Sequence, residues 1–242
     1  MCTELCQDIR RVNCTCPPLY TGRFCQDQIP QTFCSEFAKH GGRPQSGLYP
    51  IQFPDGTASI YCYFDYTDNM AWALITSFSF GNNSLFWKKP FGVDAAMNVE
   101  NFNFQAYRLS LAQITALQKH STHTASSCNF HKNQKMQKSL DFLRFNNQVL
   151  NLKRGVGECI KVEFVNVRGT GCKLCTAWMT QGKKKFLNLS VYNSKRFDCS
   201  LQVPNRVYQE RAFGYYEKYN TAFSCTATSH STTQWWLGVL MS

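Results

Sequence analysis

The sequence predicts an α+β protein that is rich in short strands and cross-linked by disulfides. Its 242 residues include 13 cysteines, a high proportion for a cytosolic protein of this size. Hydrophobic residues make up 43% of the chain, with 19 Phe, 11 Tyr and 5 Trp, which excludes a disordered polypeptide. Short apolar segments alternate with turn residues, and no apolar run is long enough for a transmembrane helix.

The cysteines fall into two groups, which predict two domains of unequal size. Five lie in residues 2–25 and eight in residues 34–225. A segment of about 25 residues cannot bury a useful core, so disulfides must hold the first group together. Residues 26–32 contain a proline and little apolar material, which is typical of a boundary. The predicted division is a small module over 1–28, a linker over 29–33 and a large domain over 34–242.

The large domain opens with a pattern that predicts a β-hairpin. Leu48–Phe53 and Ser59–Phe64 are short strand-like segments, and Pro54-Asp55-Gly56-Thr57 between them is a turn sequence. A disulfide between Cys34 and Cys62 would close a loop across this hairpin and contribute on the order of 3 kcal/mol in the loop-entropy model. The further elements expected are a strand over Ala71–Phe80, a helix within Tyr107–Leu117 that begins with a capping box of Ser110 and Gln113, and a core strand over Ile160–Val167.

Residues 14–25 have a distinctive cysteine spacing. Cys14 and Cys16 are followed by Cys25, with an aromatic-x-Gly sequence before the last cysteine. The spacing resembles the C-terminal part of an EGF-like module. The resemblance implies the disulfides Cys2–Cys14 and Cys16–Cys25 and leaves Cys6 unpaired, because the first cysteine of the family is missing. The chain is then expected to start inside such a module; the alternative is that Cys6 forms an intermolecular bridge. The calcium-binding end of the family's module is absent, so no calcium site is implied.

Residues 34–75 contain a series of short motifs in a characteristic order. The motifs are Cys34, Ser46-Gly47-Leu48-Tyr49-Pro50-Ile51, Asp55-Gly56, Tyr61-Cys62 and Trp72-Ala73-Leu74-Ile75. Their order resembles the opening of a fibrinogen C-terminal-type domain, and later segments resemble a divergent, cnidarian-like branch of fibrinogen-related proteins. The resemblance implies a strand-rich fibrinogen-related domain over 34–242. The family's calcium loop is not found, and Asp65 and Asp68 are too few for a hard-cation site, so no metal is expected.

The remaining cysteines allow 15 disulfide pairings, among which the sequence does not choose. They are Cys128, Cys159, Cys172, Cys175, Cys199 and Cys225. Cys172-Lys-Leu-Cys175 has three interpretations: a structural disulfide site at a turn between strands, a redox pair, or half of a zinc site. Structural disulfides are favoured, because no thioredoxin-like context and no second pair of zinc ligands accompany the motif.

Catalysis is not predicted for this chain. His120-x-x-His123 is the closest pair of histidines, and bridged cysteines would leave no thiolate for a Cys-His nucleophile pair. No hydrolase, metalloprotease or phosphate-binding motif is present. The chain is therefore expected to be non-enzymatic and to need no cofactor.

The C-terminal segment is rich in aromatic residues, of which four are candidates for ligand binding: Tyr215, Tyr216, Trp235 and Trp236. Sugars and acetyl groups are commonly bound by an aromatic wall with a few fixed polar groups. Fibrinogen-type lectins build such a pocket near a late disulfide, so the resemblance implies a pocket near Cys225. The alternative is that these rings fill the core.

The formal net charge of +11, from 26 Lys and Arg against 15 Asp and Glu, favours anionic partners. The basic residues occur in short groups such as Lys183-Lys184-Lys185, which fit either a solvated basic surface or contact with acidic or sulfated glycans. Nucleic acid is not an expected partner, because disulfides persist in secreted compartments. Sequons make Asn82 and Asn188 candidate glycosylation sites, whereas the sequon at Asn13 adjoins a cysteine expected to be bridged.

The leading hypothesis is an extracellular recognition module, secreted or part of a larger surface protein. It would bind glycans or an extracellular protein in a lectin-like manner, in adhesion or innate recognition. The alternative is an adhesive matrix component without a small-ligand pocket, and a thiol-dependent enzyme is a third hypothesis. No signal peptide is visible, and the N-terminus is expected to be incomplete.

Overall fold

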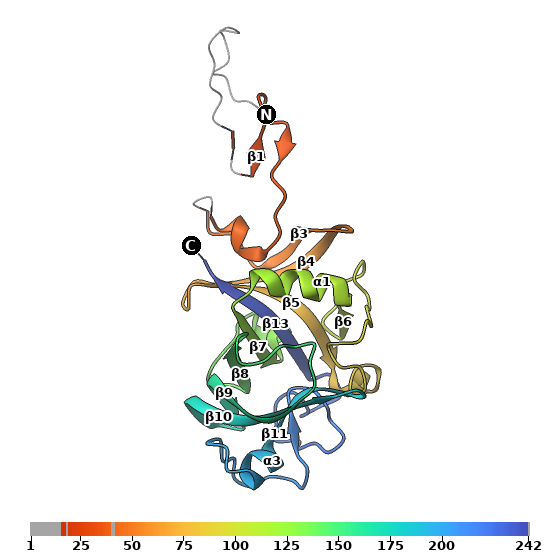
Figure 1. The fold of residues 1–242 in the computed structure, drawn as a ribbon, viewed down its shortest axis with the longest axis vertical. Helices are drawn as coiled ribbons and strands as arrows, with labels where there is room; N and C mark the ends of the chain where they lie inside the picture. The colour runs from red at the N-terminus through yellow and green to blue at the C-terminus, as the bar shows by residue number, and fades with distance from the viewer. Residues whose placement is uncertain (1–15, 18, 40–41, 242) are drawn as a thin grey trace.

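The structure is a computed structural model that describes residues 16–17, 19–39 and 42–241. Asn13 and three of the cysteines discussed above, Cys2, Cys6 and Cys14, lie outside the described residues, so the pairing of Cys2 with Cys14 and the free thiol of Cys6 stay predictions. Figure 1 shows an N-terminal hairpin projecting from one end of a larger body, with a short helix, α3, at the opposite end.

The described residues form two antiparallel sheets. The N-terminal sheet pairs β1 with β2, and the second has eleven strands in the order β12-β11-β10-β9-β8-β7-β13-β5-β4-β3, with β6 also paired to β5. The strands are β1 (Tyr20–Thr21), β2 (Asp27–Gln28), β3 (Gly47–Phe53), β4 (Gly56–Asp65), β5 (Met70–Ser79), β6 (Ala106–Arg108), β7 (His123–Cys128), β8 (Phe142–Asn146), β9 (Val156–Val167), β10 (Thr170–Gly182), β11 (Lys185–Ser190), β12 (Arg211–Ala212) and β13 (Thr232–Leu240). The helices are η1 (Cys34–Phe37), η2 (Phe80–Leu85), α1 (Leu111–His120), α2 (Phe130–Asn133) and α3 (Val191–Arg196). The strand-rich, disulfide-bridged α+β class predicted from the sequence agrees with this architecture.

The predicted hairpin and the predicted helix are both present. Phe53 pairs with Gly56 across a turn of two residues, so β3 and β4 lie in the register that the alternating pattern requires. At the start of α1, Ser110 accepts a hydrogen bond from the backbone of Gln113, whose side chain in turn accepts one from the backbone of Ser110. This reciprocal capping box supplies partners for backbone groups that the first turn of a helix leaves unpaired.

The core is built around β13, which lies between β5 and β7 in the middle of the large sheet. Every residue of β5 is buried, and so are Trp235 and Trp236 of β13. Gly238 of β13 faces the indole of Trp72: a Cβ atom built at Gly238 would lie 2.3 Å from Cε3 of that ring. A residue without a side chain is therefore required there for β13 to pack against β5.

Disulfides connect the described cysteines in five pairs. Cys16–Cys25 ties the segment before β1 to the loop between β1 and β2, and Cys34–Cys62 ties η1 to β4, as expected. The other bridges are Cys128–Cys225, Cys159–Cys199 and Cys172–Cys175. The expectation that Cys172 and Cys175 lie at a turn between strands is wrong, since both lie within β10. Positive φ angles at Arg168 and Gly169 complete the reversal between β9 and β10 before the first of the two cysteines.

The large domain begins earlier than the predicted boundary. Phe33 is 1% exposed in the core, and the backbone oxygen of Gln31 accepts a hydrogen bond of 2.7 Å from the backbone N–H of Gln52 on β3. The end of the predicted linker 29–33 therefore packs against the large sheet and does not separate two free modules.

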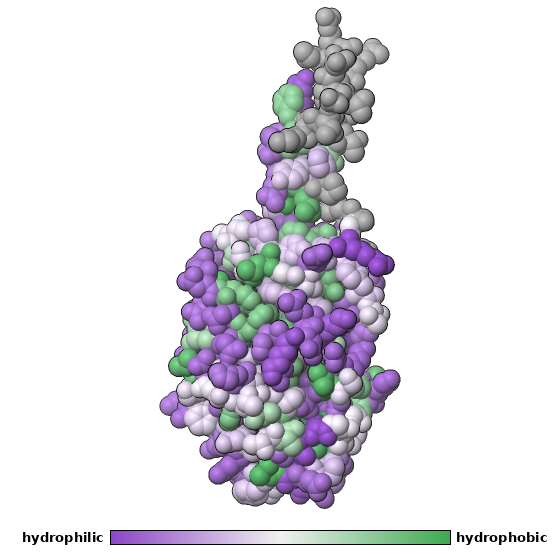
Figure 2. All heavy atoms as spheres, turned by 180° about the vertical axis from the view of Figure 1, so that it is seen from behind, coloured by the Kyte–Doolittle hydropathy of each residue, from purple (hydrophilic) through white to green (hydrophobic). Residues whose placement is uncertain are grey.

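Hydrophilic side chains cover much of the molecular face shown in Figure 2, with smaller hydrophobic patches between them. Within the described residues, no helix is long and apolar enough to span a membrane.

Candidate functional site

A cleft of about 350 Å³ lies beside α3, at the end of the body opposite the N-terminal hairpin. Its walls come from α3 and from the loop that leads to β12, and the lining side chains are Tyr192, Asn205, Arg206 and Tyr208. Two aromatic rings, an amide and a guanidinium around one concavity are the typical composition of a small-ligand site.

Tyr192 is positioned by the start of α3. The side chain of Ser190 accepts a hydrogen bond of 3.1 Å from the backbone N–H of Asn193, which caps the helix immediately after β11. Val191, between this cap and Tyr192, is buried, and its backbone N–H donates to the backbone oxygen of Glu210. Tyr192 is therefore fixed to the edge of the large sheet while its ring stays partly exposed.

The loop that carries the other three residues is anchored at its beginning by β10. The Cys159–Cys199 disulfide fixes its first residue to β9. Leu201 is 1% exposed, and its backbone N–H donates a hydrogen bond of 2.9 Å to the backbone oxygen of Thr176. These contacts hold the first part of the loop against the sheet.

A buried ion pair between Arg168 and Glu210 anchors the other end of the loop. The guanidinium donates to both carboxylate oxygens, with distances of 3.0 and 3.2 Å, and Nη2 also donates to the backbone oxygen of Pro204 at 2.9 Å. Oε2 of Glu210 accepts a hydrogen bond of 3.1 Å from the backbone N–H of Val207. The backbone is thus held on both sides of Asn205 and Arg206, so the cleft is formed before any ligand arrives.

The two tyrosine rings and the guanidinium of Arg206 in the cleft contact one another. The centroids of the Tyr192 and Tyr208 rings are 5.2 Å apart in an edge-to-face arrangement, and Arg206 lies over the Tyr192 ring at 6.0 Å. Tyr208 is 65% exposed, so most of its ring surface is accessible to a ligand. The cleft therefore presents an apolar face next to a positive charge.

The structure places three of the four aromatic candidates in the core. Tyr216, Trp235 and Trp236 are all at most 3% exposed, and each has a polar partner there. The Tyr216 hydroxyl lies 2.6 Å from Oγ1 of Thr233, and the indole N–H groups of the two tryptophans donate to the backbone oxygen of Phe213 and to Oγ of Ser127, respectively. With their surfaces and polar groups occupied inside the protein, these rings do not line the cleft.

The fourth candidate, Tyr215, belongs to a separate basic surface. Its ring stacks on Trp87 with centroids 5.2 Å apart, and the ammonium of Lys185 lies 5.1 Å from its centroid. Burial, together with the nearby charge of Arg211, lowers the pKa of Lys185 below its ordinary value. Tyr215 itself is only 8% exposed, so it offers little area to a ligand.

The two candidate glycosylation sites have different surroundings. Asn188 is completely buried in β11, and its Nδ2 donates hydrogen bonds to the backbone oxygens of Thr180 and Phe186 at 3.1 and 2.7 Å. The expectation of a glycan at Asn188 is therefore wrong for the folded chain, because the nitrogen that would carry the sugar has no access to solvent. Asn82, in η2, is partly exposed and stays a candidate.

After expression through a eukaryotic secretory pathway, we expect the folded protein to carry an N-linked glycan at Asn82 and none at Asn188. Enzymatic deglycosylation converts a glycosylated asparagine to aspartate, and peptide mass spectrometry detects the conversion at each sequon. The variant Asn82→Gln should remove the glycan mass. A glycan on Asn188 in folded protein would contradict the burial of that residue.

The acidic residues and the histidine considered at the sequence level are engaged in contacts with other side chains or with the backbone. Asp65 accepts hydrogen bonds from the following turn, and Asp68 forms ion pairs with Lys138 and Arg144. Burial raises the pKa of Asp68, but these two cations outweigh burial and bring that pKa below its ordinary value. Nε2 of His123 lies 3.0 Å from Oε1 of Glu163. Among the described residues, no group of three or more His, Cys, Asp or Glu side chains has the arrangement of a metal site.

The residues of the cleft have only a weak signature in the sequence. Tyr192, Arg206 and Tyr208 lie outside every motif singled out above, and they come together only because α3 and the loop before β12 fold against the same strands. A local signal existed in the mixture of proline, asparagine, arginine and tyrosine over residues 204–208, a composition found in binding loops. No protein-family model matches this chain, and no curated protein matches it.

Proposed function

We propose that this chain is a non-enzymatic, extracellular recognition module that binds glycans, and that the cleft between α3 and the loop before β12 is its binding site. The observation that supports this function is the cleft itself, where Tyr192, Tyr208 and Arg206 surround one rigidly anchored concavity. Aromatic faces pack against the apolar C–H surface of sugars, and a few fixed polar groups select their orientation.

The preferred ligand is a sugar that carries a carboxylate or a sulfate group. Arg206 supplies a guanidinium, which matches the geometry of such anions better than an ammonium does. The formal net charge of +11 also favours anionic partners at long range. Five disulfides among the described residues support an oxidising, extracellular location. The resemblance to an EGF-like module followed by a cnidarian-like fibrinogen-related domain, over 1–28 and 34–242, belongs to the same proposal.

A glycan array screened at two salt concentrations, with and without calcium, tests the proposal. We expect selective binding of acidic sugars that survives physiological salt. A follow-up titration measures the contribution of the ring of Tyr208. We expect Tyr208→Ala to lose roughly 1.4 kcal/mol of binding free energy, which raises Kd about tenfold. Arg206→Gln should raise Kd by about ten- to a hundredfold for acidic sugars, because hydrogen bonds to charged groups contribute roughly 1.5–3 kcal/mol.

A matched control exists on the same molecule. Arg43 lies over the ring of Tyr66 at 5.3 Å, and that ring is 41% exposed, so this is also a surface arginine–tyrosine pair. Arg43→Gln and Tyr66→Ala should leave glycan affinity unchanged. Two results together would contradict the proposal and favour an adhesive matrix component. The first is that no sugar binds. The second is salt-sensitive retention on heparin that Arg206→Gln and Arg43→Gln weaken equally.

A further inference from the structure

The Cys172–Cys175 disulfide differs from the other bridges of the large domain in what it connects. Its two cysteines lie in the same strand, only 3 residues apart. The other three bridges join residues 28, 40 and 97 apart and tie different elements together. In the loop-entropy model, the stabilisation from a disulfide grows with the length of the loop it closes. Holding distant parts of the fold together therefore does not explain this bridge.

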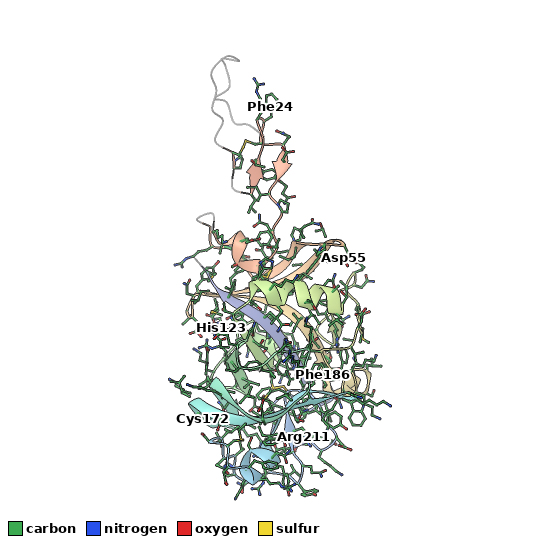
Figure 3. All side chains as sticks on the ribbon, in the orientation of Figure 1. Phe24, Asp55, His123, Cys172, Phe186 and Arg211 are labelled. Atoms are coloured by element: carbon green, nitrogen blue, oxygen red, sulfur yellow. A yellow bond between two sulfur atoms is a disulfide. The ribbon has the colours of Figure 1, made fainter. Side chains whose placement is uncertain are left out.

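The bridge lies on an open edge of the large sheet. β10 pairs with β9 along its whole length, but with β11 only from Met179 to Gly182. The rest of β10 has a strand on one side only, and since the loop after α3 hydrogen-bonds to Thr176, the open part of this edge lies before that residue, around the bridge. Figure 3 shows Cys172 at the margin of the body, and it is the third residue of β10. Unpaired backbone groups on such an edge are able to bind an extended segment of another protein.

The backbone between the two cysteines is displaced from regular strand geometry. Leu174 has a φ of 49°, in the left-handed region that residues with a Cβ atom avoid, and it is absent from the register of pairs between β9 and β10. Its side chain is 72% exposed. The bridge therefore encloses a short bulge that points into solvent.

The two sulfur-bearing residues are not equally accessible. Cys172 is partly exposed, whereas Cys175 is 8% exposed. Of the other cysteines in the large domain, Cys34, Cys62, Cys128, Cys199 and Cys225 are at most 5% exposed, and only Cys159 is partly exposed like Cys172. A thiolate must reach a sulfur atom to attack a disulfide, so access favours attack at Cys172.

We propose that Cys172–Cys175 is a site of thiol–disulfide exchange, and that its partner is a dithiol protein which docks along the open edge of β10. A thiolate of the partner attacks Sγ of Cys172 and forms a mixed disulfide, while the bond to Cys175 breaks and Cys175 leaves as a thiolate that takes up a proton. The second thiol of the partner then attacks its own bridged sulfur and releases Cys172 as a thiol. The protein disulfide gains two electrons and two protons, and the partner dithiol becomes a disulfide.

This inference is independent of glycan binding, because the cleft beside α3 and the bridge share no residue. Opening of the bridge would release the constraint that encloses Leu174 in its bulge.

The test uses the full chain with reduced thioredoxin as the dithiol protein and, in a second arm, glutathione at the same thiol concentration. Reaction is stopped by alkylation, and mass spectrometry follows each cysteine over time. We expect Cys172 and Cys175 to be alkylated at least about tenfold faster than any cysteine of the three longer bridges. Thioredoxin should exceed glutathione by a similar factor. Equal reduction of all four bridges of the large domain would overturn the proposal, and a faster reaction with glutathione would overturn docking along the edge.

A trapping experiment identifies the sulfur that is attacked. A thioredoxin variant that lacks its second cysteine should accumulate as a mixed disulfide with Cys172. Capture only through Cys175, or through another bridge in preference, would contradict the proposal. The double variant Cys172→Ser/Cys175→Ser should stay folded with a melting temperature within a few degrees of the parent, because the bridge closes so short a loop. Global unfolding of that variant would show that the bridge is structural and overturn the inference.

Discussion

Replacing Glu210 with alanine is expected to lower the free energy of unfolding by about 3–5 kcal/mol, because removal of one partner leaves a buried charge without compensation. The Glu210 side chain is 1% exposed and that of Arg168 is 10% exposed, so solvent cannot replace the missing carboxylate. The change also removes the acceptor for the backbone N–H of Val207. Equilibrium denaturation with urea measures the loss.

The double variant Arg168→Met/Glu210→Ala is the control for this prediction. It removes both charges, so we expect it to be more stable than Glu210→Ala alone. Together with the single variant Arg168→Met it completes a cycle that measures the coupling between the two side chains. Glu210→Ala and the double variant should both bind acidic glycans more weakly, because the loop that carries Arg206 loses its anchor. A loss below about 1 kcal/mol for Glu210→Ala would mean that the pair behaves like an exposed salt bridge.

The substitution Trp236→Ala is expected to lower the free energy of unfolding by about 3–5 kcal/mol, because it empties a large volume in a core that cannot collapse around it. The indole of Trp236 is completely buried, with its centroid 4.7 Å from that of Phe130, and its N–H donates to Ser127 at 3.0 Å. Below the unfolding transition, glycan affinity should stay unchanged. Denaturation and glycan titration on the same sample separate the two roles.

Trp178→Ala is the matched tryptophan control. Trp178 also contacts an aromatic ring, with its centroid 4.2 Å from that of Phe197, but it is only partly buried. We expect a smaller loss of stability than for Trp236→Ala, because solvent fills the space that the indole leaves. A marked loss of glycan binding by folded Trp236→Ala would contradict the assignment of this residue to the core.

Local patterns in the sequence predicted local structure well. The strands of the first hairpin follow from alternation around Pro54-Asp55, and the start of α1 follows from Ser110 and Gln113. These signals work because the interactions that produce them lie within a few residues of each other. The Cys34–Cys62 bridge was predictable for the same reason, since it spans a single hairpin.

Features that depend on distant contacts were not predictable. The sequon at Asn188 is correct as a pattern, but burial of its side chain depends on the packing of β11. The sequence left open whether Trp235 and Trp236 fill the core or line a ligand pocket, because their environment depends on where β13 lies in the sheet. The cleft depends on a loop with positive φ angles at Asn205 and Gln209, which the ion pair of Arg168 fixes from another part of the chain. Neither residue type requires such an angle, so the composition of 204–208 indicates a binding loop without predicting its backbone conformation.

The central place of β13 has a consequence for the order of events during protein synthesis. The strands before it in the sequence belong to two groups, β3 to β5 on one side and β7 to β12 on the other, and the larger sheet joins them through β13. The ribosome makes residues 232–240 only after both groups, so the emerging chain holds two incomplete half-sheets with open edges. Such intermediates expose apolar surface and fold slowly, because their closing contacts lie far apart in the sequence. We therefore expect the two half-sheets to stay unjoined until β13 has emerged, and the Cys128–Cys225 bridge to form late.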